Sequence, residues 1–277
     1  MQEIDELLRN MNALDAWLTA EVSGLISAVD TWLTQLSDSL TGWLDGLPAD
    51  LTPTGRLKAL IGWLAGLGDL GAGGIAGLVD ELLSGSVERL TGYFSLLTGV
   101  PFVAGNNLSR LDRQLRIQAS GLIDATVGLH LREALTRGLT NAVLARTDIT
   151  GLRLIGGEIL GRDGVAFRGL SSTLEEVSLV FVRAWTETAA SGLKLTHYYY
   201  MGTQIGTTRV FCRDRIGRTY PKIEVEKWAD LSWAGKMSGT TRETIFWYLG
   251  GYRCRHRLLP VTRRVYDFLN QKQKSNG

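Results

Sequence analysis

The amino-acid sequence predicts an α+β protein, with a mainly helical N-terminal half followed by a small α+β C-terminal domain. Apolar residues recur every three or four positions along residues 3–47, and the β-branched and aromatic run 193–202 is typical of a strand. The composition, 44% apolar and 21% charged, is that of a folded chain. We expect a helical region over 1–147, an α+β domain over 148–265 and a polar tail over 266–277.

The N-terminal half divides into three predicted helical regions. The apolar stripe of residues 3–47 ends before Pro48 and has acidic residues opposite it. Forty residues is long for a helix, so this region is either a helix pair or a long helix that needs a partner, and we expect self-association through it. Glycines interrupt the second region, 55–98, and a loop at 101–107 precedes a third region at 108–146.

The C-terminal part has mixed signals. Residues 148–167 are punctuated by glycine and fit short strands or turns. A helix is predicted from 171 to 192, because Ser172 or Thr173 with Glu175 or Glu176 forms a capping pattern and Gly192 supplies an end. The strand 193–202 follows, and the tail after 265 is expected to fray.

Charge is distributed unevenly, although the net charge is only +2. Residues 1–100 hold 4 basic and 13 acidic side chains, whereas residues 201–277 hold 15 basic and 6 acidic ones. The basic C-terminal part could face nucleic acid or an acidic protein surface. Its arginines are scattered and show no recognition-helix pattern, so any DNA contact is expected to be non-specific, and docking to a protein is favoured.

The polar, acidic N-terminus predicts no secretory signal. Residues 60–79 are apolar with one charge, which raises the question of a membrane span. Seven of these twenty residues are glycine, which lowers hydrophobicity and helix propensity. A buried or partner-covered helix is therefore favoured, and a membrane-active protein is kept as an alternative.

Catalytic motifs are weak. The sequence has no GxSxG elbow, HExxH pair or P-loop, and the glycine string 66–71 does not follow a convincing strand. Cys254 and His256 could act together, but no third group is evident that would orient them. We therefore predict that the chain is not an enzyme, with a small thiol- or metal-dependent enzyme as an alternative.

Metal binding is the better chemical hypothesis. Cys212, Cys254 and His256 are residues of the types that zinc prefers, and His197 is a candidate for a fourth ligand. The spacing is unlike that of a zinc finger. A structural zinc site, two reduced buried cysteines and a disulfide therefore all remain open, although a reducing cytosol disfavours the disulfide.

Two separated blocks carry a resemblance to a known family. The first runs from Tyr200-Met201-Gly202 through Thr208–Arg213 to Gly217–Tyr220, and the second is Gly250–Arg257, followed by Pro260-Val261. Together they resemble the C-terminal domain of the phage Mu F-like minor head proteins, also called head morphogenesis proteins. The match covers about 195–262. The chain differs at Arg253, where the family often has Asn, and at Leu258, where it often has Trp.

The resemblance implies a structural virion protein of a tailed bacteriophage. Such a protein would dock near the portal or the major capsid protein and aid head assembly or genome delivery. Its expected location is the virion head or neck region, and the host cytoplasm during assembly. A Cys/His cluster would then be structural, with arginines pointing outward. The alternative is an internal protein that is ejected with the DNA and contacts a membrane only then.

Overall fold

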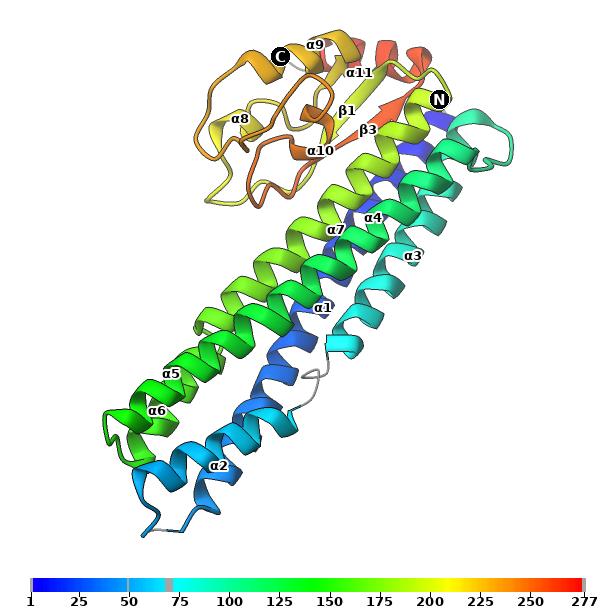
Figure 1. Cartoon of the computed structure of the whole chain (residues 1–277). Helices are drawn as coiled ribbons and strands as arrows, with labels where there is room; N and C mark the ends of the chain where they lie inside the picture. Colours follow the sequence, from blue (N-terminus) through cyan, green and yellow to red (C-terminus); the bar gives the residue numbers. More distant parts are fainter. Residues whose placement is uncertain (1, 49, 68–71, 276–277) are drawn as a thin grey trace. The chain divides into compact units, whose positions relative to one another are not determined.

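A computed structural model describes residues 2–48, 50–67 and 72–275 and confirms the predicted fold class. Most of its helices and strands are labelled in Figure 1. The long elements are α1 (Gln2–Asp45), α2 (Pro53–Gly66), α3 (Ala72–Thr98), α4 (Asn106–Asp124), the π-helical turn η1 (Ala125–Leu131), α5 (Arg132–Leu144), α6 (Ile149–Leu160) and α7 (Val165–Gly192). The C-terminal elements are β1 (His197–Met201), α8 (Val210–Arg213), β2 (Thr219–Pro221), α9 (Lys222–Lys227), the 3-10 turn η2 (Trp228–Asp230), α10 (Ile245–Tyr248), β3 (Arg257–Val261) and α11 (Arg263–Ser275).

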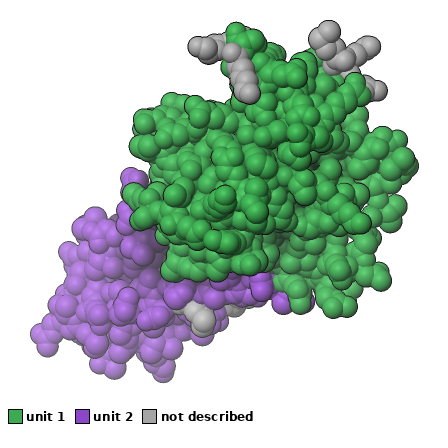
Figure 2. All heavy atoms as spheres, turned by 90° about the horizontal axis from the view of Figure 1, so that it is seen from above, with its two compact units in different colours: residues 1–21, 82–116, 176–277 green, residues 22–81, 117–175 purple. Residues whose placement is uncertain are grey.

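The chain forms two compact units that are discontinuous in sequence (Figure 2). Unit 1 contains residues 1–21, 82–116 and 176–277, and unit 2 contains residues 22–81 and 117–175. Helices α1, α3, α4 and α7 contribute to both units. The boundary that we expected near residue 148 falls inside unit 2.

Helix α1 confirms the N-terminal prediction as a single helix rather than a helix pair. Its apolar stripe is buried in the single chain, at positions Ile4, Leu7, Met11, Leu14, Leu18, Val22, Leu25, Val29, Leu33, Leu36, Leu40 and Leu44. Burial of this stripe stabilises a helix that would be marginal alone. Self-association through α1 stays a prediction.

The prediction of short strands or turns over 148–167 is wrong for most of that range, where unit 2 has helix α6. The side chain of Asp148 caps this helix by accepting a hydrogen bond of 2.8 Å from the amide of Gly151. A Cβ atom at Gly156 would collide with the side chain of Leu40, so this glycine permits close packing rather than a turn. The pattern misled because small residues also serve helix contacts.

Two helix boundaries also differ from the prediction. Helix α7 ends at Gly192 as expected but begins at Val165, so the serine and threonine near 172 lie within the helix and do not cap it. The tail is helical as well, because α11 extends to Ser275. Its residues Val265 and Leu269 are buried, and this contact orders a segment that was expected to fray.

The sheet of unit 1 is antiparallel, in the order β2-β1-β3. Strand β1 confirms the predicted strand for residues 197–201 of the expected range 193–202, and its Tyr199 pairs with Thr219 of β2 and with Leu259 of β3. Alternation places Tyr198 and Tyr200 in the core, where their rings contact Phe246 and Trp228 respectively. The sheet therefore supports the loops that follow β1 and precede β3.

Helices complete the core of unit 1. Trp185 of α7 packs against Phe94 of α3, with ring centroids 6.0 Å apart. Tyr93 of α3 donates a hydrogen bond of 2.5 Å to the carbonyl of Pro260 in β3, which ties the helices to the sheet. Among the described residues, no helix is both long and apolar enough to cross a bilayer. Residues 68–71 of the glycine-rich segment lie outside the described residues.

Candidate metal centre

The three ligands predicted from the sequence come together in unit 1. The Sγ atoms of Cys212 and Cys254 are 3.8 Å apart, and Nδ1 of His256 is 3.7 Å from the Sγ atom of Cys254. The ligand atoms of all three residues lie within 4.8 Å of one another, and all three side chains are buried. Cys212 lies on the short helix α8. This buried group could hold a metal ion.

Aromatic packing positions helix α8. The ring of Phe211 stacks on Trp233 with centroids 4.1 Å apart and meets Trp228 edge-on at 5.7 Å. The guanidinium of Arg215 covers the ring of Phe211 and donates a hydrogen bond of 2.7 Å to the carbonyl of Phe211. Because Phe211 is fixed in this way, the next residue, Cys212, is directed into the interior of the unit.

The glycine pair explains how the second cysteine reaches the first. A Cβ atom at Gly250 would overlap the sulfur of Cys212 and lie 2.9 Å from the sulfur of Cys254. Gly251 has φ +91° and packs against the backbone of Gly235, so it needs both the left-handed conformation and the missing side chain. Both glycines are therefore required by the close approach of the thiols and the tight turn before them.

A buried arginine that the sequence analysis missed holds the ligand segment. Arg183 of α7 is 5% exposed and donates hydrogen bonds to the carbonyl oxygens of Trp247, Cys254 and His256. The bond from its Nη2 to His256 is 2.7 Å long. The sequence did contain a signal for this residue, because Arg183 is a lone arginine within an apolar stretch of a predicted helix. Arg183 is therefore a positioning residue, because it fixes the backbone of two ligands.

We expected the arginines of the second block to point outward, but one of them is buried. Arg253 and Arg255 are exposed, but Arg257 is only 3% exposed. Its Nη2 atom lies 3.0 Å from a carboxylate oxygen of Asp15 on α1. Burial lowers the pKa of Arg257 to about 10, while the Asp15 carboxylate acts in the opposite direction. Arg257 is buried because it lies in β3, where side chains alternate between the two faces of the sheet and both faces are covered.

Proton affinity differs between the two thiols. The hydrogen bond from Cys212 lowers the pKa of the Cys254 thiol well below its usual value, and His256 and the Arg183 guanidinium act in the same direction. The hydrogen bond to Cys254 and burial together raise the pKa of Cys212. Cys254 is therefore the thiol that deprotonates first, and a thiolate is the form that binds metal.

The donor set fits zinc by residue type and nearly fits it by distance. With Zn–S bonds of about 2.3 Å and Zn–N bonds of about 2.1 Å, tetrahedral geometry separates two sulfurs by about 3.8 Å and a sulfur from a nitrogen by about 3.6 Å. The observed separations of 3.8 Å and 3.7 Å agree with these values. The ligand atoms of the remaining pair, Cys212 and His256, lie within 4.8 Å of each other.

His197, the expected candidate for a fourth ligand, is not part of this group. Its ring packs against Tyr266 of α11 with centroids 4.5 Å apart, and its Nδ1 atom lies 3.2 Å from the hydroxyl of Thr196. Burial lowers the pKa of His197, and the neighbouring Arg263 adds to this effect. The described residues therefore supply three ligands.

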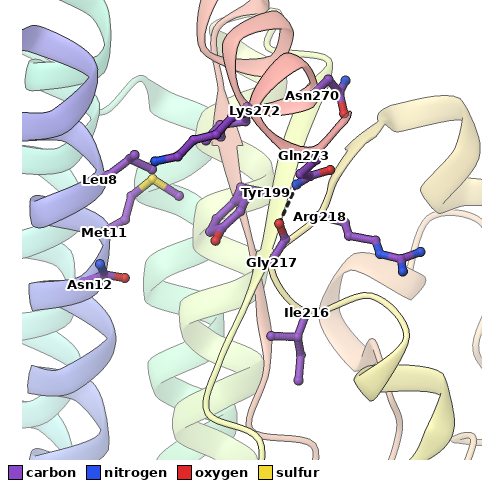
Figure 3. Close-up of a pocket in the computed structure, with 11 residues that line it drawn as sticks. Leu8, Met11, Asn12, Tyr199, Ile216, Gly217, Arg218, Asn270, Lys272 and Gln273 are labelled. Atoms are coloured by element: carbon purple, nitrogen blue, oxygen red, sulfur yellow. Dashed lines mark hydrogen bonds between the residues drawn. The ribbon is translucent and has the colours of Figure 1, made fainter. Parts of the chain in front are cut away.

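A cavity of about 760 Å³ lies elsewhere in unit 1, between the N-terminal part of α1, strand β1, the loop before β2 and helix α11 (Figure 3). Gln273 crosses its rim and donates a hydrogen bond of 2.6 Å to the carbonyl of Gly217. Tyr199, Arg218 and Lys272 also line the cavity. Its lining residues offer amide and cationic groups but no thiol, imidazole or carboxylate, so the Cys/His group is the better candidate for chemistry.

Comparisons with known proteins identify no relative. No protein-family model, curated protein or solved structure matches the chain.

Proposed function

We propose that this protein is a structural minor head protein of a tailed bacteriophage, which docks near the portal or the capsid and aids head assembly or genome delivery. The observation that supports this proposal is the convergence of the two resembling sequence blocks. Cys212 of the first block and Cys254 of the second are 42 positions apart, yet their sulfurs are 3.8 Å apart. A two-block resemblance that had arisen by chance would not require these two blocks to meet.

The proposed role of the Cys/His group is structural, with zinc as the metal. Zinc bound by Cys212, Cys254 and His256 would connect α8 to the segment before β3, which are far apart in the sequence. The host cytoplasm, where a phage head assembles, keeps thiols reduced and available to a metal. Metal binding would therefore stabilise the module before it meets its partner.

The exposed charge around this module suggests how it docks. Arg213, Arg253 and Arg255 are exposed on or near the two ligand-bearing segments, and residues 201–277 carry a net charge of +9. Such a surface suits an acidic region of the portal or the major capsid protein. Non-specific contact with packaged DNA is the second use of the same charge, and it would weaken steeply with salt.

Co-assembly tests the proposed function directly. The full chain is co-expressed with the portal and major capsid proteins of a tailed phage, and particles are separated from free protein by sedimentation. We expect the chain in the particle fraction, in few copies, and we expect Arg253→Glu/Arg255→Glu to reduce its incorporation. Recovery of the wild-type chain only as free protein would contradict the proposal.

Elemental analysis with a thiol count tests the metal. We expect about one zinc per chain, which is lost in Cys254→Ser and retained in the control His130→Ala, because His130 is exposed and lies outside the ligand group. A disulfide detected by mass spectrometry, or two free thiols with no bound zinc, would contradict the zinc assignment.

A further inference from the structure

A cavity of about 350 Å³ reaches the ligand group from one side. Cys212, Cys254 and His256 form part of its wall, and the remainder comes from the loop after β1 and from the segment that carries Cys254. The other lining residues are Thr203, Ile205, Thr207, Thr208, Arg209, Arg253 and Arg255. We call this space the arginine-lined cavity.

The number of ligands indicates why this cavity matters. Zinc sites that are purely structural have four protein ligands, whereas sites with three keep one position for an external ligand. Here the group contains three donors among the described residues, and the same three residues line the arginine-lined cavity. A metal held by this group would have its fourth position open to that cavity.

The charge of the cavity selects the kind of ligand. Three of its lining residues are arginines, and none is Asp or Glu. Arginine presents several N–H donors that match the oxygens of phosphate or carboxylate groups. Hydroxyl groups from Thr203, Thr207 and Thr208 add further polar partners. The polar and cationic side chains around the metal group therefore suit an oxyanion better than an apolar molecule.

Local contacts hold this wall in place. Arg209 donates a hydrogen bond of 2.6 Å from its Nη2 atom to the carbonyl of Tyr252, and it packs against Gly235. The hydroxyl of Thr208 accepts a bond of 2.8 Å from the amide of Ile205. A preformed wall of this kind lowers the entropic cost of binding a ligand.

A buried polar atom supplies a second, independent observation. His256 is only 5% exposed, and its buried Nε2 atom has no hydrogen-bond partner among the described residues. A buried ring nitrogen without a partner is costly, and a metal-bound histidine ordinarily has its other nitrogen satisfied. His256 also lines the arginine-lined cavity, which places this residue between the buried group and the cavity.

We propose that the arginine-lined cavity binds a small oxyanion, of the phosphate or carboxylate class, as the fourth ligand of the metal held by Cys212, Cys254 and His256. This inference rests on the metal assignment made under the proposed function. The oxyanion is bound and not transformed. One of its oxygens would complete the coordination of a metal held by these three residues, and its remaining oxygens would accept hydrogen bonds from the arginines.

The test uses the full chain loaded with Co²⁺, which replaces zinc and has visible absorption bands that respond to its ligands. Co²⁺ is first titrated into the protein to establish stoichiometry and thiolate coordination. Inorganic phosphate and acetate are then added separately at constant ionic strength. We expect either anion, or both, to shift the cobalt bands with saturation, and the response to each anion reports which oxyanion the site accepts.

Arginine variants locate the effect. Arg255→Ala is expected to weaken anion binding about fivefold without changing cobalt stoichiometry, because it removes one partly solvated charge from the cavity. Arg218→Ala is the matched control, since Arg218 is also exposed but lines the other cavity. Equal weakening in both variants would overturn the proposal, because the effect would then be one of general charge.

The remaining outcomes separate this inference from the metal assignment. Cobalt bound through thiolates at one equivalent, with bands that neither anion alters, would overturn the anion site and leave the metal assignment in place. Failure of the chain to bind cobalt would overturn both. Neither result bears on particle incorporation, so the proposed structural role is judged separately.

Discussion

Replacement of Gly250 by alanine tests whether the close approach of the two thiols is essential to the fold. The new Cβ atom would overlap the sulfur of Cys212 and lie 2.9 Å from that of Cys254, whereas ordinary contacts between such atoms are about 3.5–4.0 Å. Gly250 does not have a positive φ, so the substitution adds bulk without backbone strain. The thiols must therefore separate.

The structure sets the size of the expected effect. Both cysteines are almost fully buried, at 1% and 3% exposed, and aromatic packing and the hydrogen bonds of Arg183 fix their segments. Overpacking of such a site costs about 2 kcal/mol, which corresponds to a fall in melting temperature of roughly 4–8 °C. Widening the distance between the sulfurs also removes the tetrahedral fit, so we expect zinc content to fall in parallel.

Thermal unfolding followed by circular dichroism, together with zinc and thiol analysis, measures both effects. Gly206→Ala is the control, because a Cβ atom there meets nothing within 4 Å and its φ is not positive. We expect this control to melt within about 0.5 kcal/mol of the wild type. If Gly250→Ala matched the control in stability and in zinc content, the steric argument for the Cys/His group would be wrong.

Three further predictions follow from the buried charges and tyrosines of unit 1. Arg183→Met should lower the free energy of unfolding by about 3 kcal/mol, since three carbonyl oxygens lose their donor, and a urea midpoint equal to that of the wild type would contradict this. Asp15→Asn should cost about 3 kcal/mol in the same assay, because it leaves the guanidinium of Arg257 buried without a counter-charge; an unchanged midpoint would show that this pair does not matter. Stability should also fall above pH 10, since burial raises the pKa of Tyr93 and Tyr198 and the folded protein keeps protons that the unfolded chain loses. Tyrosinate absorbance should then rise together with the loss of circular dichroism, and ionisation near pH 10 without unfolding would refute this.

The sequence alone determined the helices with regular apolar periodicity and the strand at residues 197–201. Periodicity of 3.6 or 2 is a local property, so α1 and β1 could be located without knowledge of their partners. The residue types of the candidate metal group were also readable, because a chain with two cysteines and three histidines leaves few candidates. Their convergence was an expectation that depended on the family resemblance.

Only the tertiary structure decided which glycines turn the chain and which permit packing. Gly156 lies within a helix against Leu40, whereas Gly251 occupies a left-handed turn, and nothing in the neighbouring sequence separates these uses. The same is true of the arginines, because Arg255 is exposed while Arg257 and Arg183 are buried. Burial and charge pairing arise from contacts between residues that are distant in sequence, as between Asp15 and Arg257, and no local pattern carries that information.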